Sequence, residues 1–212
     1  RVITWDERGF GGTRATGDFS YWDSARDALG LLDHLGIDKA VVGGMSQGGF
    51  LSLRVALTAP DRVRGLILID TQAGTEDHDK VEGYGQLHDA WVAYGSAAVQ
   101  EVIGGIILGA GEWGSWFDKW AKIETQQFTY AFNCLMGRDD VTGRLGEITA
   151  PTLIIHGDAD AAIPVSKAEV LRDQLAGRTE LVVIPGGTHA ANLTHPNETN
   201  AAISRFLSGL GS

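Results

Sequence analysis

Short apolar runs alternate with helical patterns along this chain. The runs are rich in β-branched and aliphatic residues and lie at residues 1–5, 39–43, 65–69, 152–156 and 180–184. Each run is continuously apolar instead of alternating, which is typical of strands that are covered on both faces. The alternation predicts an α/β fold, a mostly parallel sheet with helices on both faces.

The predicted helices have recognisable start and stop signals. Ser20 and Asp23 stand at the spacing of a capping box, and the helix that follows them is expected to end near Gly36. Further helices are predicted at residues 47–59, 165–176 and 196–210. The first of these is stopped by Pro60 and the second by Gly177.

Between residues 74 and 147 the alternation of strand and helix patterns is interrupted. The stretch contains no good strand and holds four of the six tryptophans, Trp91, Trp113, Trp116 and Trp120. It is therefore predicted to be a helical cap or lid inserted into an α/β core made of residues 1–73 and 148–212. Its aromatic side chains either pack against the core or line an apolar pocket, and both interpretations stay open.

Composition narrows the range of partners. The chain has 212 residues, with 17 Lys or Arg and 27 Asp or Glu, so its formal net charge is −10. This excess of acid argues against nucleic acid as a partner, and no apolar run is long enough to cross a membrane. The single cysteine, Cys134, cannot form an internal disulfide, which is compatible with a reducing compartment such as the cytoplasm. No Cys/His cluster has the spacing of a metal site, and no cofactor is expected.

The most informative motif is G-x-S-x-G at residues 44–48, placed between a predicted buried strand and a predicted helix. In that context a sharp turn projects the central residue, Ser46, from the carboxyl end of the sheet. The backbone amide of Gln47 then lies at the start of a helix, where it can stabilise a developing negative charge. A glycine-rich nucleotide-binding turn is the alternative, but neither G-x-G-x-x-G nor a P-loop pattern is present.

A serine nucleophile needs a base, and His189 is the best candidate among six histidines. It stands in a glycine-rich loop after the last predicted strand, and the order serine, acid, histidine supports it. The others have weaker claims: His34 lies on an exposed helix face, His78 and His88 fall in the insertion, His156 ends a buried strand, and His195 starts a helix.

The base in turn needs a carboxylate to orient it. Asp160 follows the strand at residues 152–156 and is the preferred acid. Asp70 follows the strand at residues 65–69 and competes with it, because both strands end at the same edge of the sheet. Asp158 can instead hold its turn through hydrogen bonds to the backbone, the ordinary role of aspartate in loops.

These motifs together resemble the α/β-hydrolase superfamily, in its esterase, lactonase and C–C hydrolase branch. The resemblance covers residues 5–13 (WDERGFGGT), the elbow at Ser46, residues 59–63 (APDRV), residues 157–164 and residues 186–189 (GGTH). It implies that Ser46 is the nucleophile, Asp160 the acid, His189 the base and Gln47 one backbone oxyanion donor. Serine at the elbow argues against the dehalogenases and epoxide hydrolases of the superfamily, which use aspartate there.

The chain departs from that family at its beginning. By resemblance, three strands precede the one predicted at residues 1–5, and the third of them lies next to the elbow strand, followed by a loop with the second oxyanion amide. We therefore expect a missing segment or a second chain to complete the sheet, unless residues 2–5 pair directly with residues 41–43. The expected activity is hydrolysis of a carboxylic ester or lactone; C–C bond hydrolysis, cofactor-free perhydrolysis and non-catalytic ligand sensing are the alternatives.

Overall fold

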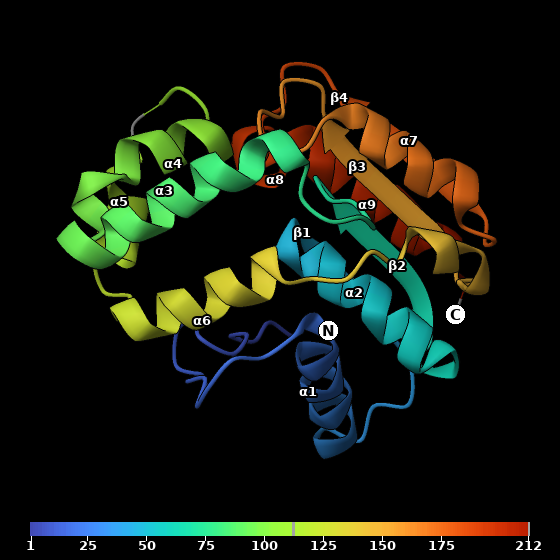
Figure 1. Cartoon of the computed structure of the whole chain (residues 1–212). Coiled ribbons are helices and arrows are strands. Elements are labelled where there is room, and N and C mark those ends of the chain that lie inside the picture. The colour runs from blue at the N-terminus through green and yellow to red at the C-terminus, as the bar shows by residue number, and fades with distance from the viewer. Residues whose placement is uncertain (112, 212) are drawn as a thin grey trace.

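The centre of the molecule is a parallel sheet of four strands, seen in a computed structural model that describes residues 1–111 and 113–211 (Figure 1). The strands are β1 (Ala40–Met45), β2 (Val63–Ile69), β3 (Thr152–Gly157) and β4 (Thr179–Ile184). Their order in the sheet is their order in the chain, and every neighbouring pair is parallel. All four carboxyl ends therefore lie at one edge, where the loops that follow β1, β3 and β4 meet.

Helices cover both faces of this sheet, which confirms the predicted α/β class. On one face α1 (Tyr21–His34), α2 (Gln47–Thr58) and α7 (Val165–Gln174) bury a core with the side chains of β2 and β3. On the other face α8 (Ala191–Thr194) and α9 (Pro196–Gly209) pack against a second, smaller core. Short 3₁₀ helices lie at Pro60–Arg62, Ser96–Ala98 and Thr142–Glu147.

The predicted start of the first helix is confirmed in detail. The Ser20 side chain accepts from the amide of Asp23, and the Asp23 carboxylate accepts from the amide of Ser20 at 2.9 Å, a complete capping box. The helix ends at His34, and Gly36 follows with a φ of 63°, a conformation that glycine adopts without steric cost.

One predicted strand is wrong. Residues 1–5 form no strand and pair with none in the described parts of the chain, and Val2 is 89% exposed. The alternative in which residues 2–5 pair directly with residues 41–43 is therefore wrong, and β1 forms an edge of the sheet. An apolar, β-branched run becomes a strand only where a neighbouring strand accepts its hydrogen bonds, and residues 1–5 have no such neighbour.

The stretch between β2 and β3 is helical. It contains α3 (His78–Tyr94), α4 (Gln100–Ile107), α5 (Gly114–Trp120) and α6 (Thr125–Met136), which gather beyond the carboxyl ends of the strands (Figure 1). Trp91 of α3 is buried and stacks on Phe128 of α6 at 4.1 Å between ring centroids. The division into a core and a cap at residues 74 and 147 stays a prediction.

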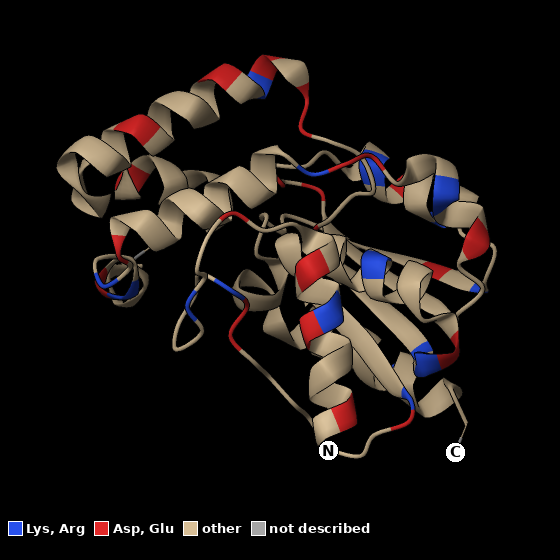
Figure 2. Ribbon diagram, turned by 60° about the horizontal axis from the view of Figure 1, so that its bottom comes forward, with Lys and Arg blue, Asp and Glu red and all other residues tan. Residues whose placement is uncertain are grey.

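Charged residues are spread over the outer faces of the helices and the loops. Figure 2 shows Lys and Arg interspersed with Asp and Glu, without a continuous band of cations. Among the helices of residues 1–111 and 113–211, none combines the length and the apolarity that a bilayer crossing requires.

Candidate active site

Ser46 lies on a sharp turn between β1 and α2. Its backbone adopts φ 51° and ψ −111°, a conformation that is rare for a residue with a side chain. The turn is held by a hydrogen bond from the Ser46 amide to the Ile69 carbonyl oxygen at 2.8 Å. It is also tight: a Cβ on Gly44 would stand 2.6 Å from the Cα of Gly48. Gly44 lets the strand and the helix pass at a distance that a side chain at this position would prevent, whereas a Cβ on Gly48 would meet no atom within 4 Å.

The structure brings His189 next to this serine. His189 Nε2 lies 2.9 Å from Ser46 Oγ, and His189 Nδ1 lies 2.8 Å from Asp160 Oδ2. With Nδ1–H donating to the carboxylate, Nε2 is free to accept the proton of the serine hydroxyl. The three residues come from the loops after β1, β3 and β4, so parallel strands of one sheet place them together.

Asp160 is held as a carboxylate by several donors. Its Oδ1 accepts from the amides of Ala162 and Ile163 at 2.8 and 2.9 Å, and its side chain is fully buried. Burial alone would raise the pKa of Asp160, but hydrogen bonds from His156 and His189 outweigh burial and hold the pKa below its ordinary value. Asp160 therefore stays ionised at neutral pH.

The competing acids have other partners. Asp70 accepts from the amides of Gly157 and Ala191 at 2.8 and 3.0 Å, and burial raises its pKa to about 6. It therefore ties β3 and α8 to the end of β2 and makes no hydrogen bond to His189. Asp158 is exposed and accepts from the Gly186 amide at 2.6 Å, which is the turn-holding role proposed for it from the sequence.

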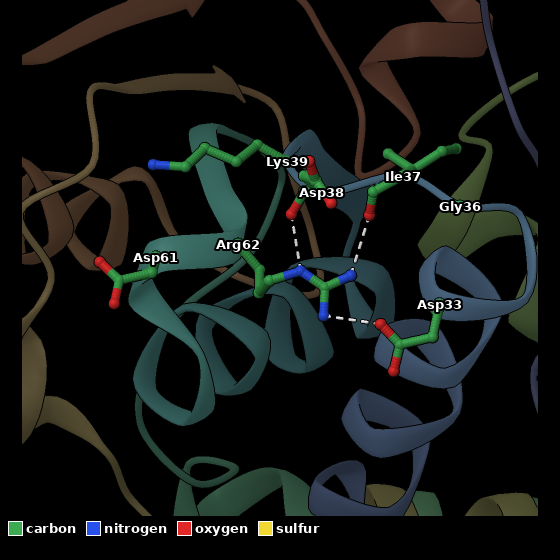
Figure 3. Close-up of a pocket in the computed structure, with 7 residues that line it drawn as sticks. All are labelled: Asp33, Gly36, Ile37, Asp38, Lys39, Asp61 and Arg62. Atoms are coloured by element: carbon green, nitrogen blue, oxygen red, sulfur yellow. Dashed lines mark hydrogen bonds and ion pairs between the residues drawn. The ribbon is translucent and has the colours of Figure 1, made fainter.

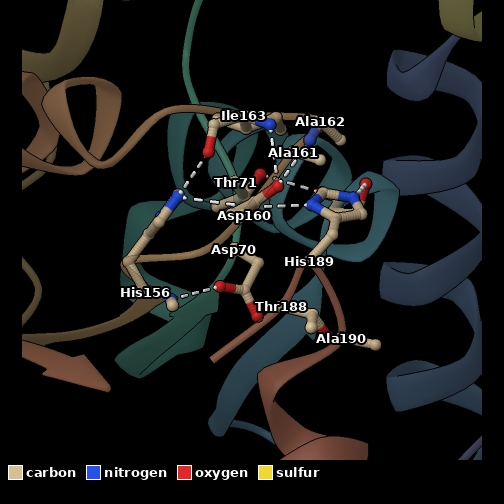
Figure 4. A network of polar contacts seen from close by, with 12 residues as sticks. Asp70, Thr71, His156, Asp160, Ala161, Ala162, Ile163, Thr188, His189 and Ala190 are labelled. Carbon is tan, nitrogen blue, oxygen red and sulfur yellow. Dashed lines mark hydrogen bonds and ion pairs between the residues drawn. The ribbon is translucent and has the colours of Figure 1, made fainter. Parts of the chain in front are cut away.

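The remaining histidines lie in different settings. His34 and His78 are exposed, and His195 contacts Thr194 Oγ1 at the start of α9. His88 lines the cavity above Ser46, with its ring stacked on Phe132 at 4.3 Å. His156 is buried against Asp160 (Figure 4). Sequence reasoning missed this last contact, for which the only signal is a histidine at the end of a buried strand four residues before the acid.

The backbone amide of Gln47 lies in the first turn of α2, where amides have no partner within the helix. The Gln47 side chain is tied back, because its Oε1 accepts from the Tyr21 hydroxyl at 2.9 Å. The amide is thus available beside Ser46 while the side chain is held in place. A positive helix end at this position favours negative charge.

A cavity of about 200 Å³ opens above Ser46 and His189. Most of its wall is apolar and comes from three helices of the stretch between β2 and β3. The lining residues are Ser46, Gln47, Phe50, Glu76, Tyr84, Leu87, His88, Ile103, Ile106, Ile107, Phe128, Phe132, Leu135, Ala162, Ile163 and His189. Of the two interpretations left open for the aromatic residues of this stretch, lining applies to tyrosine, phenylalanine and histidine side chains, whereas Trp91 packs inside the helical stretch.

The ionisable side chains Glu76 and Tyr84 of this wall carry no unpaired charge. Glu76 accepts from Arg138 Nη2 at 2.8 Å, and Arg138 also donates to the carbonyl oxygens of Gly74 and Leu135. Burial raises the pKa of Tyr84 to about 12, so its hydroxyl is uncharged. The cavity therefore offers an anionic ligand no unpaired cation among its described lining residues. No pattern along the chain indicates that Glu76 and Tyr84 line it.

A second hollow lies at the amino ends of β1 and β2 (Figure 3). Arg62 donates there to the carbonyl oxygens of Asp38 and Ile37 at 2.6 and 2.9 Å and pairs with Asp33 at 2.7 Å. Its guanidinium is thus used to join the loop before β1 to the turn before β2. This hollow is a structural joint at the opposite end of the sheet from Ser46.

One group of side chains could offer metal ligands. Potential ligand atoms of Asp70, His156 and Asp160 lie within 4.8 Å of one another. Both carboxylates, however, are engaged by the amides and histidines described above. The cluster is a hydrogen-bonded network within the fold.

Comparison with known proteins identifies the family. Residues 1–110 match the family described as the alpha/beta hydrolase fold. A non-heme haloperoxidase of Rhodococcus erythropolis is 28% identical, the match covering 98% of this chain and 82% of the relative. The 3-oxoadipate enol-lactonase 1 of Acinetobacter baylyi is 26% identical, with 99% and 79% covered. The chain belongs to the α/β-hydrolase fold family.

A solved structure supports the same assignment. A thermophilic esterase from Thermogutta terrifontis has a TM-score of 0.86 to this chain at 25% identity, covering 98% of this chain and 79% of that one. The matching family and the hydrolases among the relatives identify the protein as an α/β hydrolase.

Proposed function

We propose that the protein is a serine hydrolase that cleaves an uncharged carboxylic ester or lactone through an acyl-enzyme. The observation that carries this proposal is the line of hydrogen bonds from Ser46 to His189 to Asp160, at 2.9 and 2.8 Å, at the base of an apolar cavity. Such a line makes a serine hydroxyl nucleophilic, because a base accepts its proton as it attacks.

Acylation follows from this arrangement. Ser46 Oγ attacks the carbonyl carbon while its proton passes to His189 Nε2, and the Gln47 amide donates to the resulting oxyanion. Asp160 keeps the proton on His189 Nδ1 and stabilises the imidazolium. When the tetrahedral intermediate collapses, His189 gives its proton to the leaving alkoxide, and the acyl group stays on Ser46.

Deacylation repeats these steps with water. His189 takes a proton from a water molecule as the water oxygen attacks the acyl carbon. His189 then returns that proton to Ser46 Oγ as the carboxylic acid is released. In a lactone the leaving oxygen belongs to the acyl chain, so one hydroxy acid is released.

The cavity supports an uncharged, apolar acyl group. Its wall consists mainly of aliphatic and phenyl side chains, and Arg138 is engaged by Glu76. Two other arginines of the chain, Arg8 and Arg14, pair with Asp27 and Glu124. A free carboxylate elsewhere on the ester or lactone substrate would therefore be buried without a counterion, which is costly in free energy.

The decisive experiment is pre-steady-state hydrolysis of p-nitrophenyl butyrate by the wild type and Ser46→Ala. The wild type is expected to release a burst of nitrophenol and to carry the acyl mass on the peptide with Ser46. In Ser46→Ala the burst is lost and kcat falls on the order of 10⁶-fold, as when the serine of a serine protease is removed.

Ser208→Ala is the matched control, because Ser208 is exposed on α9 and its hydroxyl donates a hydrogen bond to the Ser204 carbonyl oxygen. It is expected to keep the burst. Turnover of Ser46→Ala within a few-fold of the wild type would show that Ser46 is not the nucleophile.

Similarity to a non-heme haloperoxidase supports a second activity on the same acyl-enzyme. Hydrogen peroxide in place of water would attack the acyl carbon and release a peracid, with the same proton transfers through His189. Peracid formation from acetate ester and hydrogen peroxide, lost in Ser46→Ala, is the expected signature. Hydrolysis without peracid would restrict the protein to water as acceptor.

A further inference from the structure

Asp160 contacts a second histidine, His156, besides His189. The ring of His156, at the end of β3, places Nε2 2.8 Å from the Ile163 carbonyl oxygen and 3.3 Å from Asp160 Oδ2 (Figure 4). The side chains of His156 and Asp160 are both fully buried. No water competes for this contact, so it is stronger than the same contact at a surface.

The surroundings of the ring define which nitrogen bears a proton. Nε2 faces two oxygen acceptors, and a lone pair there would be repelled by both, so Nε2 carries hydrogen. His156 Nδ1 has no hydrogen-bond partner within the described residues. The ring is therefore oriented as a donor toward Asp160 Oδ2 and the Ile163 carbonyl oxygen.

The titratable groups around the ring reinforce this orientation. Asp70 and Asp160 face it from the ends of β2 and β3, and His189 lies behind Asp160. Burial by itself would lower the pKa of His156, but the contacts with Asp160 and Ile163 outweigh burial and raise it above its ordinary value. Protonation of Nδ1 would add a charge to the ring and leave the Nε2 donor unchanged.

Asp160 Oδ2 is consequently shared between two histidines. Its other oxygen accepts from the amides of Ala162 and Ile163, so two amides and two histidine rings surround both oxygens. A carboxylate held in this way cannot rotate about its terminal bond without losing partners. Its negative charge is also spread over two rings, which moderates its attraction for the proton on His189 Nδ1.

We propose that His156 is a positioning residue of the triad acid: its Nε2–H donates to Asp160 Oδ2 and fixes that oxygen in line with His189 Nδ1. This proposal rests on the proposed function of Ser46, His189 and Asp160. Loss of the donor would let Asp160 reorient and would concentrate its charge on His189. The transition state, in which His189 is an imidazolium, depends on that alignment more than substrate binding does.

The test compares His156→Leu with His156→Gln in the full chain, using p-nitrophenyl butyrate. Leucine removes the donor, whereas the glutamine side-chain amide can place an N–H near the position of Nε2. For His156→Leu we expect kcat to fall about 10- to 100-fold with KM unchanged. The acidic limb of the pH profile of kcat/KM is expected to move to higher pH, because His189 then faces a less shared carboxylate.

His156→Gln is expected to restore most of kcat and the wild-type position of the acidic limb. His34→Leu, an exposed replacement on α1, serves as the control and should leave both unchanged. Equal loss in the leucine and glutamine variants, or a leucine variant with the wild-type rate and profile, would overturn the proposal. Circular dichroism and thermal unfolding report whether each variant is folded.

A measurement on the wild type keeps the proposal testable even if His156→Leu does not fold. Side-chain ¹⁵N spectra of the resting enzyme at pH 8 should show a proton on His156 Nε2, and a ring protonated on Nδ1 alone would overturn the proposal. The proposed function is decided separately, by labelling of Ser46 with a fluorophosphonate. Failure of labelling and failure of the His156 contact are therefore distinguishable.

Discussion

Asp160 and Asp70 are both buried carboxylates at the same edge of the sheet, yet their partners give them different roles. Asp160 contacts two histidines, and Asp70 accepts from two backbone amides. The partner of a carboxylate, more than its depth, decides whether it takes part in proton transfer.

This difference predicts unequal effects of isosteric replacements. Asp160→Asn is expected to lower kcat on the order of 10⁴-fold, because the asparagine amide favours the wrong tautomer of His189. Asp70→Asn keeps the rate within about tenfold but lowers the free energy of unfolding by about 1 to 3 kcal/mol, since one backbone amide loses its acceptor.

Ester hydrolysis and urea unfolding of the two variants check this expectation. If kcat falls steeply in Asp70→Asn but not in Asp160→Asn, the acid of the triad is Asp70 at the end of β2.

The three residues of the proposed triad could be predicted from the sequence because each belongs to a local pattern. Ser46 stands in a five-residue motif, and His189 and Asp160 follow predicted strands, so sheet topology alone brings them to one edge. His156 and Glu76 were not accessible in this way. Their contacts depend on side-chain directions and on partners in other elements, which no spacing along the chain encodes.

At the scale of elements, the junction of β1 and α2 leaves no room for a side chain at Gly44. A Cβ on Gly44 would stand 2.6 and 2.7 Å from backbone atoms of Gly48, which cannot move aside without shifting the helix. Gly44→Ala is therefore expected to cost at least about 1 to 3 kcal/mol of stability and to reduce kcat sharply by displacing Ser46.

Gly30→Ala is the matched control. Gly30 lies inside α1, and a Cβ there meets no atom within 4 Å. Alanine should stabilise the helix by about 0.5 to 1 kcal/mol and leave kcat unchanged. Thermal unfolding and ester hydrolysis of both variants measure the difference, and a fully active, stable Gly44→Ala would show that the elbow is less constrained than its geometry indicates.

The four strands of the sheet were predicted within a few residues because buried parallel strands are continuously apolar. Residues 1–5 show the limit of that signal, since their β-branched residues have no neighbouring strand to pair with. The bounds of α3 to α6 were not predicted, because glycines such as Gly83 and Gly85 interrupt the helical pattern and few polar caps mark the ends.

At the scale of the whole molecule, the size of the cavity limits the substrate. About 200 Å³ is less than the 300 to 1,000 Å³ of drug-sized ligand sites. In a series of p-nitrophenyl esters from acetate to palmitate, kcat/KM is expected to peak at short or middle chain lengths. Leu135→Ala enlarges the cavity and should move the peak to longer chains.

Leu207→Ala is the control for this series, because Leu207 is 45% exposed on α9, outside the cavity. It should leave the chain-length profile unchanged. A peak at palmitate in the wild type would show that the cavity opens much further during turnover.

The cavity wall and the proposed catalytic residues come from separate stretches of the chain. Helices α3, α4 and α6 supply most of the wall, whereas Ser46, Asp160 and His189 stand on loops anchored by the sheet. Mutations in those helices can therefore accumulate while the three proposed catalytic residues stay unchanged. Proteins that descend from one ancestor could therefore differ in substrate specificity while they keep the same catalytic residues. A library randomised only in these helices is the place to select new specificities.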